Sequence, residues 1–99
     1  MKRSRDRILK TIAENREAIR ALGVKRLGLF GSCARGEETR ASDLDFLVEF
    51  ETKSFDAYMG LKELLEGLFD CGVDLVLEDA VKPRLRQAIM EEVVHAPGL

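Results

Sequence analysis

Apolar residues in the first part of the chain recur with the spacing of one face of an α-helix. They stand three, four or seven residues apart, at Ile8, Ile12, Ile19 and Leu22. This period predicts a helix over residues 4–22 with one buried face. Gly23 follows it, and glycine is the residue that most often ends a helix.

Three later segments have the length and apolar content of β-strands, over residues 24–30, 44–50 and 73–78. In the second of these the residue types alternate, so two different sets of side chains point to opposite faces of a sheet. The apolar set is Leu44, Phe46, Val48 and Phe50, and the opposite set is Asp43, Asp45, Leu47 and Glu49. This strand is therefore predicted to bury one face and to present carboxylates on the other.

Two further helices are predicted in the second half of the chain. Residues 55–69 carry an apolar stripe followed by Gly72, and Pro83 fits the first turn of a last helix. The stripe consists of Phe55, Tyr58, Leu61, Leu65, Leu68 and Phe69, and the last helix is expected to turn Leu85, Ile89 and Val93 inward. With a short helical turn over residues 34–38, the order of elements predicts a small α/β sandwich, a sheet with helices on it.

The composition narrows the class of protein. A chain of 99 residues suits a single domain over residues 1–99 with one core. Its net charge of −2 gives no basic field, so direct binding to nucleic acid is not expected, and no segment is apolar and long enough for a membrane span or a signal peptide. The two cysteines, Cys33 and Cys71, are far apart, which suits a cytoplasmic protein, and a single histidine, His95, argues against zinc.

Three aspartates stand inside apolar strands, where burial of an unpaired carboxylate is costly. Asp43 and Asp45 share one face of their strand, with Cα atoms about 6.6 Å apart, and Asp74 lies in the third strand. Such carboxylates repel one another unless a cation lies between them. Oxygen ligands of this kind suit Mg²⁺ or Mn²⁺, and Asp45 could bridge two ions. The alternative is that these aspartates are solvated residues at a strand edge.

A Gly-Ser turn precedes the first aspartate by ten residues. Gly31 lets the backbone bend sharply and approach a ligand, and the hydroxyl of Ser32 can donate a hydrogen bond. Together with backbone N–H groups of the turn that follows, these donors could hold a triphosphate. Arg35 either braces the phosphates or is a surface arginine. Ser42 either bonds a phosphate or caps the entry to the strand.

The segment GSCARGEETRASDLDFLVEF resembles the signature of the minimal nucleotidyltransferases (MNT type) of the DNA polymerase β-like superfamily. The segment GVDLVLEDAVKPRLRQAIMEEVV resembles the C-terminal part of the same family, so the resemblance covers essentially the whole chain. It implies a small nucleotidyltransferase fold of the α/β (α+β) class, with a short mixed sheet flanked by helices. It also implies that Gly31 and Ser32 hold nucleotide phosphates, and that Asp43, Asp45 and Asp74 bind two Mg²⁺ ions.

The same resemblance implies an activity and a partner. Proteins of this family are commonly antitoxins that transfer AMP from ATP to a tyrosine of a HEPN-domain ribonuclease toxin, which silences it. By analogy, Asp74 coordinates the metal next to the attacking hydroxyl and could accept its proton. The expected partners are ATP and a HEPN toxin, in a hetero-oligomer or beside a second copy of the chain.

Two other functions stay open at this point. A binding module could neutralise its toxin by docking alone, and a transferase could act on a small molecule. The complete set of carboxylates favours an enzyme, because a pure binder has no need of three groups that repel one another. A small-molecule transferase would need an acceptor site from a partner or a second copy, since the chain has no room for another lobe.

Overall fold

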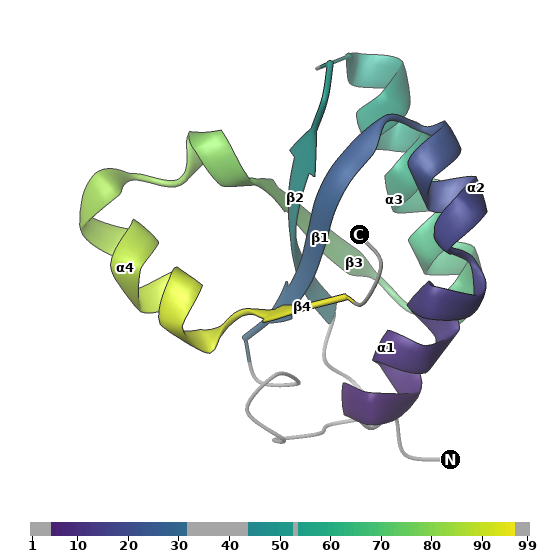
Figure 1. The fold of residues 1–99 in the computed structure, drawn as a ribbon, viewed down its shortest axis with the longest axis horizontal. Helices are drawn as coiled ribbons and strands as arrows, with labels where there is room; N and C mark the ends of the chain where they lie inside the picture. The colour runs from purple at the N-terminus through teal and green to yellow at the C-terminus, as the bar shows by residue number, and fades with distance from the viewer. Residues whose placement is uncertain (1–4, 32–43, 53, 97–99) are drawn as a thin grey trace.

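A four-stranded sheet with the order β3-β2-β1-β4 organises the computed structural model, which describes residues 5–31, 44–52 and 54–96 (Figure 1). The strand β1 runs antiparallel to β2 and to β4, whereas β2 and β3 are parallel. The predicted mixed sheet is therefore confirmed. The strands are β1 (Val24–Phe30), β2 (Leu44–Phe50), β3 (Val73–Leu77) and β4 (Val94–His95).

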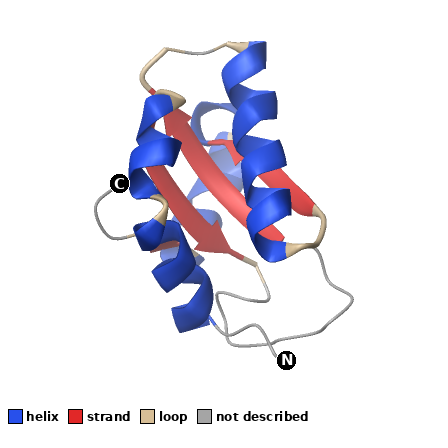
Figure 2. Cartoon of the chain, turned by 90° about the vertical axis from the view of Figure 1, so that its right-hand side faces the viewer, coloured by secondary structure: helices blue, strands red, loops and turns tan. Residues whose placement is uncertain are grey.

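The helices divide between the two faces of this sheet. Helices α1 (Arg5–Glu14), α2 (Arg16–Ala21) and α3 (Phe55–Phe69) lie on one side, and Figure 2, viewed from that side, shows them across the strands. A 3₁₀ turn, η1 (Glu78–Ala80), leads to α4 (Pro83–Glu92), which lies on the other side (Figure 1). The side covered by three helices is called the inner face below, and the other the outer face. None of the helices in the described part of the chain has the length and apolar character needed to cross a membrane.

The hydrophobic core lies between the inner face and its three helices. The apolar face predicted for β2 is confirmed, because Phe46 and Val48 are fully buried on this face. The opposite face is not wholly exposed, since Leu47 is buried there as well, at 3% exposure. Phe46 packs on Phe69 of α3, with ring centroids 6.0 Å apart and an interplanar angle of 24°. Truncating a fully buried leucine of this core to alanine is expected to cost about 2–5 kcal/mol. The other fully buried side chains are Ile8, Ile12, Ile19, Leu27, Leu29, Leu61, Leu65 and Val73.

The N-terminal helix differs from its prediction, since residues 4–22 do not form one continuous helix. It is interrupted at Asn15, whose side-chain amide donates to the carbonyl of Thr11 at 2.8 Å and whose backbone N–H donates to Ile12 at 3.0 Å. Asparagine competes in this way for backbone acceptors that a regular helix would use. The segments on both sides of the break still bury their isoleucines, so the apolar spacing predicted the buried face correctly but not the break between α1 and α2.

Helix α3 has the predicted bounds, but one residue of its stripe is not buried. The helix begins after Ser54, whose hydroxyl accepts a hydrogen bond from the N–H of Ala57 at 3.0 Å. Phe55 follows directly and is 76% exposed. The buried positions are spaced four residues apart, at Leu61, Leu65 and Phe69. Phe55 stands six residues before Leu61, which places it about 120° away around the helix at about 100° per residue.

The prediction that the last helix turns its apolar residues inward is wrong. Pro83 does stand in its first turn, but no residue of α4 is buried and Leu85 is 49% exposed. Helix α4 lies over the outer face, which carries Arg26 and Glu49 beside the buried Leu47, and the ion pair of Arg86 with Glu78 joins it to that face. Val93 makes the close approach at the end of the helix, against Gly28 of β1, which has no side chain in the way. The short strand β4, which was not predicted, begins immediately after it.

Side chains of α3 cover the edge strand β3. The hydroxyl of Tyr58 donates to the carbonyl of Leu75 at 2.6 Å, and Nζ of Lys62 donates to the carbonyl of Val73, also at 2.6 Å. Donors four residues apart on a helix lie on one side of it, and carbonyls two residues apart on a strand point the same way. The two hydrogen bonds therefore fasten one turn of α3 along the edge of the sheet.

Candidate active site

Three of the predicted site residues converge at one end of the sheet. Asp45 is the register partner of Phe30 on β1 and of Asp74 on β3, and Gly31 directly follows Phe30. Register partners on neighbouring strands point their side chains to the same face. Since Leu44 and Phe46 are buried on the inner face, both aspartates belong to the outer face. Asp45 is half-buried and Asp74 is exposed.

The two carboxylates are brought together by the parallel pairing of β2 with β3. Adjacent strands lie about 4.7–4.9 Å apart, so the two aspartates extend from neighbouring positions on the same face. Like charges at this separation repel each other, and a divalent cation between them would reverse the sign of the interaction. The oxygen donors fit Mg²⁺ or Mn²⁺, which take carboxylate ligands and keep other positions for water or phosphate.

Gly31 closes the site on the β1 side in a conformation that suits glycine. Its φ angle is +81°, in the left-handed region that side chains other than glycine rarely adopt. A Cβ atom at this position would overlap Oδ2 of Asp45 and would lie 3.2 Å from its Cγ and 3.3 Å from its Cβ. The turn and the aspartate therefore occupy adjoining space, with no room for a side chain between them.

Four other predicted site residues, Ser32, Arg35, Ser42 and Asp43, lie outside the described residues, as does the predicted helical turn over 34–38. Their roles stay predictions. Within residues 5–31, 44–52 and 54–96, no group of three or more histidine, cysteine, aspartate or glutamate side chains is placed to hold a metal ion. The described part of the site consequently offers a pair of carboxylates, Asp45 and Asp74. His95 is exposed.

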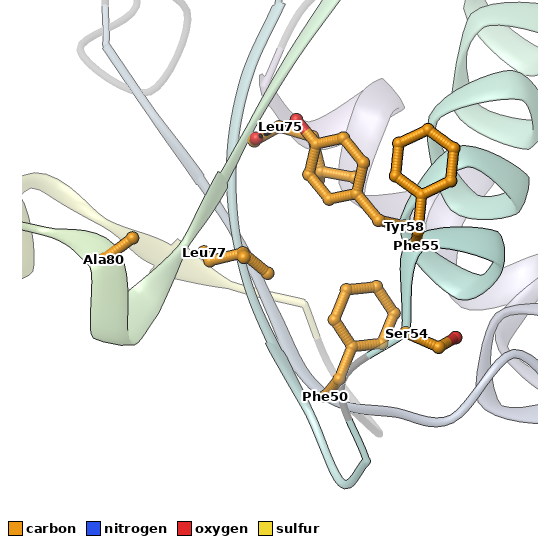
Figure 3. Close-up of a pocket in the computed structure, with 7 residues that line it drawn as sticks. All are labelled: Phe50, Ser54, Phe55, Tyr58, Leu75, Leu77 and Ala80. Atoms are coloured by element: carbon orange, nitrogen blue, oxygen red, sulfur yellow. Dashed lines mark hydrogen bonds between the residues drawn. The ribbon is translucent and has the colours of Figure 1, made fainter.

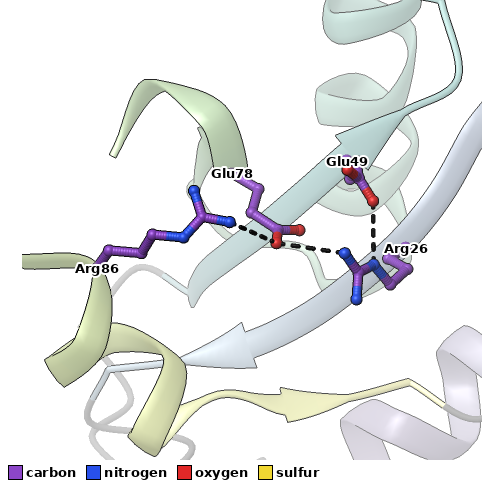
Figure 4. Close-up of polar contacts among 4 residues, drawn as sticks. All are labelled: Arg26, Glu49, Glu78 and Arg86. Atoms are coloured by element: carbon purple, nitrogen blue, oxygen red, sulfur yellow. Dashed lines mark hydrogen bonds and ion pairs between the residues drawn. The ribbon is translucent and has the colours of Figure 1, made fainter. Parts of the chain in front are cut away.

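A second set of charges on the outer face was not predicted (Figure 4). Glu78 is only 5% exposed, and its Oε1 atom accepts from Nη2 of Arg26 and from Nη2 of Arg86, each at 3.4 Å. Nε of Arg26 also donates to Glu49 at 3.0 Å. The hydrogen bond with Glu49 and the negative charges of Glu78 and Glu49 raise the pKa of Arg26. A glutamate at the end of the apolar run VDLVLE was the available signal for it.

This ion-pair network is separate from the carboxylate pair. Glu49 stands four residues beyond Asp45 on β2, which corresponds to about 13 Å along a strand. The network joins α4 to the sheet through Arg86, since Glu78 belongs to η1 and Arg26 to β1. We therefore assign the network to the support of the fold, and the carboxylate pair stays the candidate for chemistry.

An apolar pocket of about 500 Å³ lies between β3 and the first turns of α3 (Figure 3). Figure 3 shows the rings of Phe50, Phe55 and Tyr58 gathered around it beside the strand. Such a lining does not suit a triphosphate, which requires charged or polar donors. The candidate active site is therefore the end of the sheet where Asp45, Asp74 and Gly31 lie together, and not this pocket. Its remaining lining residues are Ser54, Leu75, Leu77 and Ala80.

Comparison with known proteins agrees with this geometry. Residues 7–95 match the family described as the nucleotidyltransferase domain. The protein adenylyltransferase MntA of Thermococcus cleftensis is 38% identical over 84 residues, which cover 84% of this chain and 85% of that protein. A Methanocaldococcus jannaschii protein assigned as a protein adenylyltransferase is 35% identical over 99 residues, covering 88% of this chain and 99% of its own length.

Solved structures show the same fold. A protein assigned as a minimal nucleotidyltransferase is 41% identical and superposes with a TM-score of 0.72, covering 87% of this chain and 93% of its own. A toxin–antitoxin structure with AMP-PNP is 27% identical with a TM-score of 0.66, covering 93% of this chain and 71% of that one. These likenesses confirm the resemblance carried by the Gly-Ser turn and the strand aspartates. The chain belongs to the nucleotidyltransferase domain family.

Proposed function

We propose that this protein transfers AMP from ATP to a tyrosine of a partner HEPN-domain ribonuclease and thereby silences it. The observation that carries the proposal is the pairing of Asp45 with Asp74 beside the turn at Gly31. Two carboxylates held opposite each other by the sheet can share a divalent cation of the kind that assists phosphoryl chemistry. The relatives named as protein adenylyltransferases support transfer of an adenylyl group to a protein. The toxin–antitoxin structure with AMP-PNP supports a nucleotide and a toxin as partners.

The two described aspartates would hold a divalent cation, Mg²⁺ or Mn²⁺, in keeping with the use of divalent metals by nucleotidyltransferases generally. The chemistry that such a cation supplies is neutralisation of charge on the phosphate oxygens. Half-buried Asp45 is suited to a fixed ligand, because its carboxylate is confined by the Gly31 turn. We extend the same role to Asp43, two residues earlier in the chain. A third carboxylate would allow the site to hold a second ion.

The remaining roles follow from position. Asp74 is exposed and open to an approaching protein. Its carboxylate oxygen would accept the proton of the incoming tyrosine hydroxyl. The tyrosine oxygen forms a bond to the α-phosphorus of ATP as the bond to the bridging oxygen breaks, and pyrophosphate leaves. Gly31 allows the backbone to approach the phosphates, with Ser32, Ser42 and Arg35 as further donors along the predicted nucleotide path.

Intact-mass measurement tests this function. The wild-type protein is mixed with its cognate HEPN protein, ATP and Mg²⁺, and we expect the partner to gain mass in steps of one AMP, on a tyrosine. Asp45→Asn and Asp74→Asn should each abolish the mass gain while the complex still forms. Asp56→Asn is the matched control, because Asp56 is an exposed aspartate in the first turn of α3, away from the outer face.

A protection assay separates catalysis from docking. Cells that express the toxin should survive with the wild-type chain and die with the double variant Asp43→Asn plus Asp45→Asn. Full protection by the double variant would instead show that docking alone neutralises the toxin. Mass gain on an added small-molecule acceptor with none on the HEPN protein would identify a small-molecule transferase.

A further inference from the structure

We infer that Gly31 is a positioning residue for Asp45, in addition to its expected role toward phosphates. This inference rests on the proposed function of Asp45 as a metal ligand. Because residue 31 has no side chain, there is space beside the turn in which the Asp45 carboxylate is held. The turn after β1 thus determines the direction in which a ligand on β2 presents its oxygen atoms.

The geometry shows why the two residues depend on each other. Phe30, the last residue of β1, is the register partner of Asp45, so the chain passes over the aspartate as it leaves the strand. Gly31 turns with φ +81°, and the place of its absent Cβ is occupied by Oδ2 of Asp45. A rotation of the carboxylate could move Oδ2 away. It could not move the Cβ of Asp45, which would still lie 3.3 Å from the added atom, closer than ordinary van der Waals contact.

A methyl group at residue 31 would therefore displace the carboxylate or separate β1 from β2 at this end. Either change moves a metal ligand without removing it. A residue that only opened the backbone to phosphates would, when substituted, weaken ATP binding and leave metal binding by the nucleotide-free protein intact. The inference predicts a defect in metal binding before any nucleotide is present.

Gly23 supplies a matched control within the same chain. It also has a positive φ angle, +88°, and it also stands at one end of β1, after α2. A Cβ at Gly23 would meet no atom within 4 Å. Gly23→Ala and Gly31→Ala therefore place alanine in similarly unfavourable backbone conformations, and they differ in the contact with Asp45.

The first experiment titrates Mn²⁺ alone into each nucleotide-free variant and follows the free ion by electron paramagnetic resonance. We expect Gly23→Ala to bind Mn²⁺ as the wild type does. Gly31→Ala should bind it about tenfold more weakly or worse, the size of effect seen when the groups that orient a metal ligand are disturbed. Equal Mn²⁺ affinity of the two variants would overturn the inference, whatever the transfer assay shows.

The second experiment is a double-mutant cycle on thermal stability in buffer without divalent ions. If the added methyl collides with the carboxylate, Gly31→Ala should lower Tm less in an Asp45→Ala background than in the wild type. Gly23→Ala should lower Tm equally in both backgrounds. Equal effects of Gly31→Ala in the two backgrounds would contradict the inference, as would a failure of Gly31→Ala to fold in both while Gly23→Ala folds. Because this cycle measures packing, its result is independent of whether AMP is transferred.

Discussion

Asp45 and Asp74 stand opposite each other on neighbouring parallel strands, with their side chains on the outer face of the sheet. Without a cation, the two negative charges oppose the pairing that brings them together. We expect Asp74→Asn to raise the free energy of unfolding in metal-free buffer by up to about 1 kcal/mol. This is the repulsion energy of two like charges about 4 Å apart in water. Urea denaturation with a chelator present measures it.

The same variant should lose the stabilisation that Mg²⁺ and ATP give to the wild type. A ligand that binds only the folded state raises Tm by mass action. Asp74→Asn would remove one of the carboxylates proposed to hold the ion. Asp56→Asn, remote from the pair, should keep the full shift in Tm. An Asp74→Asn protein that is stabilised by Mg²⁺ and ATP as strongly as the wild type would exclude Asp74 from the metal site.

The hydrogen bond from the Tyr58 hydroxyl to the Leu75 carbonyl predicts a measurable contribution to stability. At 2.6 Å it joins α3 to the edge of the sheet, and Tyr58→Phe removes the donor while the ring remains. We expect a loss of about 1 kcal/mol in the free energy of unfolding, since one carbonyl loses its partner at a half-buried site. Chemical denaturation checks it. An unchanged midpoint in urea would show that water replaces the hydroxyl.

The buried carboxylate of Glu78 predicts a larger effect. One oxygen of this group accepts from two arginines, so Glu78→Gln leaves two guanidinium groups with a neutral acceptor. We expect a loss of about 1–3 kcal/mol, below the usual cost of breaking a fully buried pair because both arginines are half exposed to solvent. Glu49→Gln is the control, with 33% side-chain exposure and one arginine partner, and should cost less. Equal losses of unfolding free energy for Glu78→Gln and Glu49→Gln would contradict the idea that burial of Glu78 makes its ion pairs more important for stability.

The raised pKa of Arg26 predicts how this network responds to pH. For a group whose pKa is higher in the folded state, the stabilisation is fully present below the unfolded pKa and is lost as pH rises through the folded pKa. An arginine already titrates far above neutrality, so raising its pKa moves that loss further away. The destabilisation caused by Arg26→Gln should therefore stay constant between about pH 6 and 9. Urea denaturation across this range measures it, and a decline toward pH 9 would be contrary to this prediction.

The sequence predicts this fold where burial on one face dominates. Alternation along β2 identified Phe46 and Val48 as inner residues, because a slip of one residue would have moved them to the opposite face of the sheet. The interruption at Asn15 was not predictable from the apolar period, since α1 and α2 keep their buried isoleucines in phase. The placement of α4 was also missed, because an amphipathic pattern does not tell a helix which face of a sheet it will meet.

The candidate site was predictable to a different extent. Gly31, Asp45 and Asp74 lie together at one end of the sheet. The signal in the sequence was aspartate inside apolar runs, against strand preference, after a glycine that ends a strand. The contact between Gly31 and Asp45 required the register of β1 with β2, which no local pattern contains. The partnership of Glu78 with Arg86 likewise depends on where α4 lies.

Tyr58 and Lys62 have a consequence for assembly. A peptide strand that added itself to β3 would need the carbonyls of Val73 and Leu75 as acceptors, and both already accept hydrogen bonds from α3. An invading strand would have to displace a tyrosine and a lysine before it gained any bond of its own, so α3 discourages growth of the sheet into an intermolecular ribbon. A toxin that engages this protein is accordingly expected to meet side-chain surfaces and not to extend β3.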